Sequence, residues 1–96
     1  MNNIFDQQNP RLLIRAMLTL KTEDECRAFL EDIMTTREIL DISQRMAVAR
    51  ELDAGASTLK IAETTGASPT TISRVNRCYQ YGAGGYRTVL DRWKED

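Results

Sequence analysis

The stretch Ser57–Arg77, STLKIAETTGASPTTISRVNR, contains the most informative structural pattern of this 96-residue chain. Its first half has apolar residues at helical spacing, namely Leu59, Ile61 and Ala62. Gly66 stands where a helix ends in a left-handed conformation that glycine adopts without strain. Ser68 is a preferred N-cap, and Pro69 suits the first residue of a helix. The stretch therefore predicts two helices joined by a short turn.

The two predicted helices have the residues needed to pack closely against each other. Ile61, Ile72 and Val75 are spaced to lie where the helices touch. Ala62 is small enough to let the second helix cross over the first. Two helices that meet at a steep angle through a glycine turn form a helix-turn-helix, whose second helix enters the major groove of DNA. We therefore expect a protein that binds double-stranded DNA.

The second helix has a polar, basic outer face. With Ile72 pointing inward and about 100° per residue, Val75, Asn76 and Tyr79 share the inward side. The opposite side has hydroxyl groups near the helix start, arginines further along, and no acidic residue. Hydroxyls can contact phosphates, and arginine can bind guanine O6 and N7 with two hydrogen bonds. The expected DNA-contacting residues are Thr58, Lys60, Ser68, Thr70, Thr71, Ser73, Arg74 and Arg77.

The charge is distributed unevenly along the chain. The net charge is −1, which is unusual for a DNA-binding protein. Residues 1–56 hold seven Lys/Arg and ten Asp/Glu, a net of −3, whereas residues 57–96 hold six and four, a net of +2. A small positive face gives few phosphate contacts per subunit, so two copies would bind more tightly than one.

Several classes of site are disfavoured by composition. No histidine occurs, which removes most zinc sites and the Ser-His or Cys-His nucleophile arrangements. Cys26 and Cys78 are expected to be reduced thiols in the core. The start MNNIFDQQNP is polar and no apolar run has membrane-spanning length. We expect a cytoplasmic protein with no catalytic residues, no metal, no cofactor and no membrane contact.

Helical patterns also fill the N-terminal part of the chain. Asn9 and Pro10 predict a cap and first turn, followed by a helix that is apolar on most sides. Its apolar residues are Leu13, Ile14, Met17, Leu18 and Leu20. Thr22–Glu25 is a capping box that predicts the start of a second helix. The apolar residues of that helix are Cys26, Phe29, Leu30 and Ile33.

A long helix and a short final helix complete the predicted fold. Thr35–Glu38 is a second capping box, which starts a helix of about eighteen residues that ends near Gly55. The expected inward residues of the long helix are Ile39, Ile42, Met46, Ala49 and Leu52. Gly82–Gly85 should form a loop, and Tyr86–Trp93 a helix. With no strand pattern, the fold class is all-α with about six helices.

We expect one domain and a homodimer. A chain of this length makes a single domain, with dimerising helices over 1–55, the helix-turn-helix over 57–79 and a C-terminal helix over 86–95. A helix apolar on most sides, as over Leu13–Leu20, requires burial on most sides. A central helix of a monomer would meet that requirement too. Packing across a two-fold axis fits better, because a helix-turn-helix normally reads an inverted repeat as a dimer.

The stretch Ile33–Trp93 resembles the Trp repressor superfamily, in particular its YerC/YecD-type branch. Matching features include Thr35–Glu38, Gln44-Arg45, Gly55, Gly66-Ala67, Thr71–Arg74 and Leu90–Trp93. The run Ile72–Tyr79, followed by Tyr81-Gly82 and Gly84–Tyr86, is most like that branch. The resemblance implies an all-helical dimer with intertwined N-terminal helices that acts as a transcriptional regulator, in the family's type case a repressor.

The same resemblance raises the question of a tryptophan ligand. In Trp repressors two arginines sandwich the indole of the corepressor, and Arg45 and Arg74 stand at those positions here. Thr35 and Thr71 match two further pocket positions. However, Val75 replaces the glycine that follows the second arginine in the family. A ligand pocket at Thr35, Arg45 and Arg74 is therefore less favoured than a DNA-binding or structural role for the arginines, and tryptophan is not the expected corepressor.

Other functions remain open at this point. The basic face of the second helix could be a solvated surface, or the helix-turn-helix could bind protein. Small helical dimers of the chorismate mutase type are enzymes that hold a dicarboxylate with arginines. Four arginines of this chain could line such a pocket: Arg11, Arg15, Arg45 and Arg50. Nothing in the spacing links them to a general acid or base, and the enzyme would leave Ser57–Arg77 unexplained.

Overall fold

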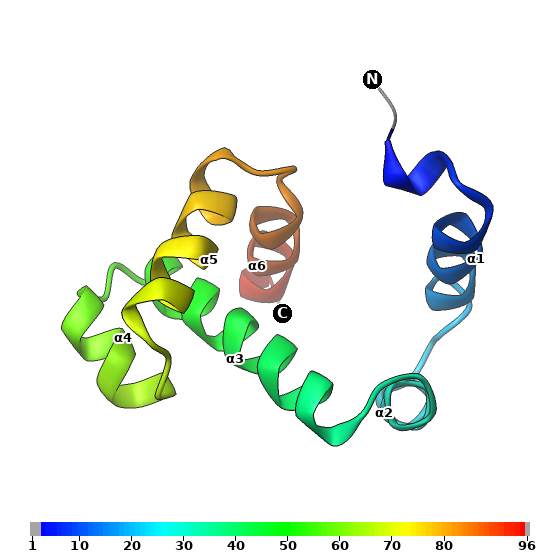
Figure 1. Ribbon diagram of the computed structural model, residues 1–96, viewed down its shortest axis with the longest axis horizontal. Coiled ribbons are helices and arrows are strands. Elements are labelled where there is room, and N and C mark those ends of the chain that lie inside the picture. Colours follow the sequence, from blue (N-terminus) through cyan, green and yellow to red (C-terminus); the bar gives the residue numbers. More distant parts are fainter. Residues whose placement is uncertain (1–2, 96) are drawn as a thin grey trace. The chain divides into compact units, whose positions relative to one another are not determined.

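The computed structural model describes residues 3–95, and these form helices joined by short connections (Figure 1). Within that range there is no β-strand. A 3-10 helix, η1 (Ile4–Asp6), is followed by six α-helices. These are α1 (Gln8–Met17), α2 (Glu23–Ile33), α3 (Thr36–Asp53), α4 (Thr58–Thr65), α5 (Pro69–Tyr81) and α6 (Gly85–Glu95). The predicted all-α fold with six helices is confirmed. None of the described helices is both long and apolar enough to cross a lipid bilayer.

The chain divides into two compact units, one up to Thr36 and one from Arg37 onward. The N-terminal unit contains η1, α1 and α2, and none of their residues is buried. The capping box of α2 is confirmed, because the Thr22 hydroxyl accepts a hydrogen bond from the Glu25 N–H at 3.1 Å. The Glu25 carboxylate in turn accepts one from the Lys21 N–H at 2.8 Å. This unit therefore has well-formed helices but no core of its own.

The start of α1 differs from the prediction that Asn9 and Pro10 cap it. The helix begins at Gln8, and Gln7 stands at the cap without a side-chain hydrogen bond. Instead the Gln7 N–H donates to the carbonyl of Ile4 at 3.1 Å, which closes the turn of η1. The chain thus enters α1 from a helical turn already formed, so no separate side-chain cap is needed.

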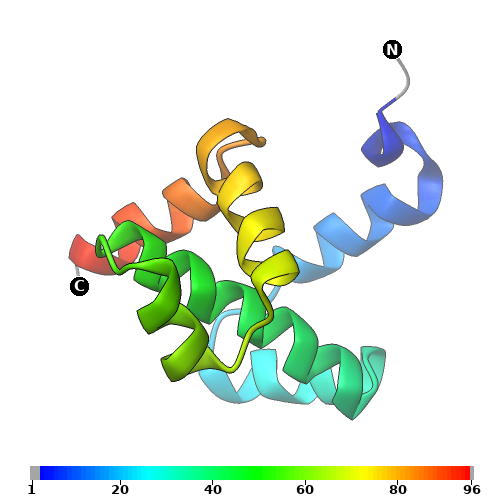
Figure 2. The same ribbon diagram turned by 60° about the vertical axis from the view of Figure 1, so that its left-hand side comes forward.

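The C-terminal unit holds the hydrophobic core. Figures 1 and 2 show α4, α5 and α6 gathered around the C-terminal half of α3. Each of the four helices, and the turn before α5, contributes buried apolar side chains. The buried residues are Val48, Ala49, Ile61, Ala67, Ile72, Val75 and Leu90. The expected contact of Ile61, Ile72 and Val75 between the two helices of the helix-turn-helix is therefore confirmed.

Two sets of residues predicted to be inward have a different environment. On α3, Ala49 is buried, but Ile42 is 47% exposed and Val48, which the wheel did not select, is fully buried. The reason is that the neighbouring helices cross only the C-terminal half of α3. Cys26 and Cys78 are free thiols as expected, but both are exposed rather than in the core. Helical spacing gave each of them an apolar face, and Cys78 borders an apolar hollow with Met46 and Tyr86 rather than lying in the core.

The turn of the helix-turn-helix has the predicted local chemistry. The Ser57 hydroxyl caps α4 by accepting from the Lys60 N–H at 3.2 Å. Gly66 ends that helix with φ of +73°, in the left-handed region. A Cβ atom there would meet only the Gln44 amide at 4.0 Å, so the backbone conformation rather than space requires glycine. The same Gln44 amide donates to the Thr65 carbonyl at 3.2 Å and ties the turn to α3.

A cluster of four polar residues, here named the Asp53 cluster, joins the ends of α3, α5 and α6. It consists of Asp53, Tyr79, Arg87 and Lys94. The Tyr79 hydroxyl donates to one carboxylate oxygen of Asp53 at 2.6 Å, and Lys94 pairs with the other at 2.5 Å. The Arg87 guanidinium lies over the Tyr79 ring, 4.2 Å from its centroid. Hydrogen bonds from Lys94 and Tyr79 hold the pKa of Asp53 below its ordinary value of 3.8.

The lowered pKa of Asp53 predicts a stability difference that depends on pH. Because the folded state favours the carboxylate, the contribution is complete well above the ordinary pKa of 3.8 and is lost as the pH falls from there through the folded-state pKa. The free energy of unfolding of wild type should exceed that of Asp53→Asn by a constant amount above about pH 5. That difference should shrink on acidification. Urea unfolding at a series of pH values measures it.

The matched control for this measurement is Asp32→Asn. Asp32 is an exposed aspartate of α2, outside the Asp53 cluster. Its substitution removes the same kind of carboxylate without touching the cluster, so the pH dependence of Asp53→Asn is read relative to it. A difference between wild type and Asp53→Asn that stays the same down to pH 2 would contradict the prediction.

Candidate nucleic-acid interface

The outer face of α5 brings together four of the eight predicted DNA-contacting residues. Thr70, Ser73, Arg74 and Arg77 are all exposed. Together with Pro69 they border one open hollow on the helix surface. This arrangement places two hydroxyl groups beside two guanidinium groups within a little over two turns of helix. Such a face offers both neutral and charged hydrogen-bond donors to a single ligand.

The two arginines of this face are available to bind an anion. Helix α5 contains Arg74 and Arg77 and no acidic residue. Among the described side chains, neither arginine forms an ion pair, in contrast to Arg37, which pairs with Asp41 at 3.0 Å. A face with positive charge and no internal partner attracts a polyanion by Coulomb forces. The geometry therefore suits phosphate and base-edge contacts.

Ser68 and Thr71 have a structural role at the start of α5. The Ser68 hydroxyl accepts a hydrogen bond from the Thr71 N–H at 3.2 Å. It also donates to the Thr71 hydroxyl at 3.1 Å. These two residues were predicted to contact DNA, but in the structure their hydroxyls pair with each other. Their first effect is to fix the start of α5 at Pro69, the first residue that borders the hollow.

Thr58 and Lys60 lie on the other helix of the pair. Both are exposed in the first turn of α4. Neither borders the hollow on α5. A lysine placed beside a reading helix rather than on it is suited to a phosphate, because an ammonium group is a point charge without the planar fork of arginine.

The residues of the predicted ligand pocket do not share one environment. Arg45 and Arg74 are exposed, whereas Val75 is only 2% exposed and belongs to the core. Thr35 lies in the N-terminal unit. Burial raises the pKa of Tyr86 on α6, and the charge of Arg45 opposes that rise, so Arg45 lies within electrostatic reach of Tyr86. The isopropyl group of Val75, which replaces the glycine of the family, is thus packed in the core.

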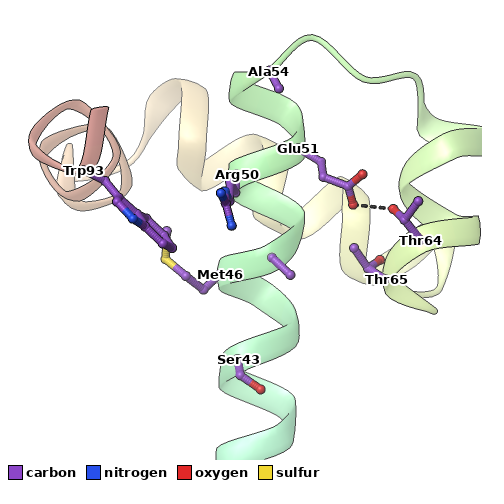
Figure 3. Close-up of a pocket in the computed structure, with 9 residues that line it drawn as sticks. Ser43, Met46, Arg50, Glu51, Ala54, Thr64, Thr65 and Trp93 are labelled. Carbon is purple, nitrogen blue, oxygen red and sulfur yellow. Dashed lines mark hydrogen bonds between the residues drawn. The ribbon is translucent and has the colours of Figure 1, made fainter. Parts of the chain in front are cut away.

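A second hollow, which the sequence analysis did not identify, lies between α3, α4 and α6 (Figure 3). It has a volume of about 530 Å³ and a mainly apolar lining. Arg50 stacks over Trp93 on one side, 4.7 Å from the ring centroid, and Thr64 donates a hydrogen bond to Glu51 on the other. The signal in the sequence was the pair of small residues Ala47, on α3, and Ala54, seven positions later and directly after that helix.

The described residues show no other obvious chemistry. No group of three or more His, Cys, Asp or Glu side chains among them is arranged to hold a metal ion. Of the arginines considered for an enzyme pocket, Arg11 and Arg15 border a hollow of the N-terminal unit with Asp6. Arg50 is engaged with Trp93. The exposed face of α5 is therefore the leading candidate for a functional surface.

Comparison with known proteins gives consistent matches. Residues 8–94 match the family described as Trp repressor protein. The chain is 47% identical over 83 residues to the uncharacterised protein YerC of Bacillus subtilis strain 168, which covers 86% of this chain and 80% of YerC. The crystal structure of a TrpR-like protein from Eubacterium eligens ATCC 27750 has a TM-score of 0.92 at 47% identity, over 97% of this chain and 96% of that one.

A second solved structure agrees with the first. The crystal structure of a Trp repressor candidate from Staphylococcus aureus has a TM-score of 0.87 at 37% sequence identity. The match covers 100% of this chain and 98% of the other. The structural match extends over nearly the whole length of both chains. It therefore includes the N-terminal helices, which lie outside the Ile33–Trp93 stretch that carries the motif resemblance.

Proposed function

This chain belongs to the Trp repressor family, and from that premise we propose that it is a sequence-specific transcriptional regulator that binds double-stranded DNA. The observation that carries the proposal is the exposed face of α5, where two arginines without an ion-pair partner border one hollow with two hydroxyl groups. The family is a regulatory, DNA-binding one rather than a family of enzymes. We place the protein in the cytoplasm, with the DNA that it reads.

In the proposed binding mode, α5 contacts the bases and α4 contacts the phosphate backbone. Helix α5 enters the major groove with its first two turns facing the base edges. Arg74 and Arg77 donate paired hydrogen bonds to guanine, and Thr70 and Ser73 donate single ones to base edges or phosphates. Lys60 on α4 binds a phosphate beside the groove. Because phosphates carry no sequence information, specificity rests on α5.

Substitutions should separate these two roles. Arg74→Ala should keep the fold, because the side chain is exposed, and should weaken binding to a preferred site by about 1–3 kcal/mol. It should relax the preference at the base pair that Arg74 reads. Lys60→Ala is the comparison variant, and it should weaken binding to preferred and random duplexes alike. Fluorescence anisotropy at fixed salt, on a site selected from random duplexes, measures both affinities.

The arms of this experiment also test the function itself. Wild type that binds no duplex more tightly than random DNA, even at low salt, would refute the proposal. If Arg74→Ala left the specific affinity unchanged, the assignment of the α5 face would be wrong even though the protein binds DNA.

We further propose that the protein acts as a homodimer with intertwined N-terminal helices. Among its described residues the N-terminal unit has none that is buried, and most of its large apolar side chains are exposed. These are Ile4, Phe5, Leu12, Leu13, Ile14, Met17, Leu18, Leu30 and Ile33. Burial of one such side chain stabilises by about 1.5–3 kcal/mol, so this surface favours association. The apolar hollow along α3 is a surface that a second copy would cover (Figure 3).

The dimer predicts both a mass and the effect of a single substitution. Light scattering on a sizing column should give a mass close to twice the 10.9 kDa of one subunit. Leu18→Asp should dissociate or unfold the dimer, because it places a charge in the proposed interface. Leu59→Asp, at a leucine that is 71% exposed on α4, is the matched control and should remain dimeric. A monodisperse wild-type monomer would contradict the proposal.

Free tryptophan is not the proposed corepressor. An indole held between Arg45 and Arg74 would need the space beside the residue after Arg74. That residue is Val75, which is 2% exposed among Ile72, Ala49 and the rest of the core. Removing its side chain to admit a ligand would leave a cavity that costs a few kcal/mol in the unliganded protein. A filled core therefore supports DNA binding without tryptophan.

Calorimetry gives a direct measurement of this point. Titration of the protein with millimolar tryptophan should show no saturable heat beyond dilution. The affinity for the selected DNA site should be the same with and without the amino acid. Saturable binding that also tightens the DNA complex would overturn the prediction and would make Arg45 and Arg74 ligand residues.

A further inference from the structure

We propose that Tyr79 and Asp53 are positioning residues for DNA reading: the hydrogen bond between them fixes how α5 is rotated on α3, and hence where Arg74 and Arg77 point. Neither residue needs to touch DNA. The inference rests on the proposed function of α5 as the recognition helix. Specificity for the DNA sequence then depends on the Tyr79–Asp53 hydrogen bond, which lies on the side of α5 that faces away from the DNA major groove.

Tyr79 lies on the face of α5 that packs on the scaffold. On the helical wheel it falls close to the buried Ile72 and on the opposite side from Arg77. Its side chain is half-buried and packs against the core. Any contact that Tyr79 makes is therefore with the rest of the protein, and its effect on DNA must pass through the orientation of the helix.

The buried apolar residues of α5 set which side of the helix faces the core, and both belong to its first half. Ile72 and Val75 are held by burial, which is non-directional. Both lie in the first two turns of the helix, before Tyr79. A hydrogen bond is directional and weakens steeply away from its preferred distance and angle. The 2.6 Å contact from the Tyr79 hydroxyl to Asp53 therefore adds a directional restraint on the second half of the helix.

Both partners of this hydrogen bond are themselves held in place. The Arg87 guanidinium lies over the Tyr79 ring, and its Nε donates a hydrogen bond to the Tyr79 carbonyl at 3.0 Å. Arg87 therefore contacts both the ring and the backbone of Tyr79. Lys94 pairs with the second carboxylate oxygen of Asp53. The Asp53 side chain is only 13% exposed, so water competes little for its oxygens. Asp53 on α3, with Arg87 and Lys94 on α6, thus forms a fixed reference for Tyr79 on α5.

Base reading is more sensitive to helix rotation than phosphate binding. A guanine accepts two hydrogen bonds from one arginine only when the planar groups are aligned. A phosphate accepts donors from many directions, and non-specific binding is mainly electrostatic. Loss of the Tyr79 hydroxyl should therefore lower the affinity for the selected site and leave the affinity for random DNA nearly unchanged.

The test compares two tyrosines of the same helix. Tyr79→Phe removes the hydroxyl and keeps the ring under Arg87. It should weaken binding to the selected site about 3- to 30-fold, and binding to random duplex by less than about twofold. Tyr81→Phe is the matched control, because Tyr81 is 83% exposed, and it should change neither affinity. All affinities are measured by anisotropy at a temperature where circular dichroism shows every variant to be folded.

A double-mutant cycle separates positioning from general stability. Asp53→Ala should show the same selective loss, and Tyr79→Phe with Asp53→Ala should lose less than the product of the two single effects. Equal losses for selected and random DNA would show a merely structural role and overturn the inference. An unchanged ratio of selected-site affinity to random-duplex affinity in Tyr79→Phe would also overturn the inference. In either case the proposed function would stand as long as the wild-type protein binds the selected site specifically. Wild type without specific binding would refute both.

Discussion

The contact of α3 with the helix-turn-helix is the constraint on which the rest of the structure depends. Val48 and Ala49 are fully buried where α4, α5 and α6 gather around α3. The small side chain of Ala49 lets the helices approach closely, and Ile72 and Val75 fill the space above it. Because this small core must face inward, the opposite side of α5 is presented to solvent with Arg74 and its neighbours on it.

Because one side of α5 faces the core, chemically similar residues on this helix have different roles. Ser68 and Ser73 are both exposed serines at the start of α5, but the hydroxyl of Ser68 is engaged with Thr71 and sets the helix start, whereas Ser73 borders the hollow. Polar groups on the inner side of α5 have a further role. Tyr79 donates to the carboxylate of Asp53, and under the inference drawn above this contact orients the helix whose outer face is proposed to read DNA.

The two units of the chain differ in what stabilises them. The C-terminal unit has a core of its own, which holds all the buried residues of the described chain, from Val48 to Leu90. The N-terminal unit has caps and hydrogen-bonded turns but leaves residues such as Leu18 exposed. Local hydrogen bonds alone rarely hold short helices in water, since most helical stability comes from packing. Under the proposed dimer, association would supply that packing and would also bring two basic α5 faces to one DNA duplex.

The sequence by itself determined the elements that depend on local chemistry. Ser57, Gly66 and Ser68 specified the ends of the two helices through capping and a left-handed turn, which are fixed within a few residues. The face carrying Arg74 also followed from periodicity alone. Only the tertiary structure decided the contacts between distant segments: the burial of Val48, the exposure of Ile42, and the bond of Tyr79 to Asp53, 26 residues away. Helical spacing defines a face but not which helix will cover it, because coverage depends on how separate elements cross in space.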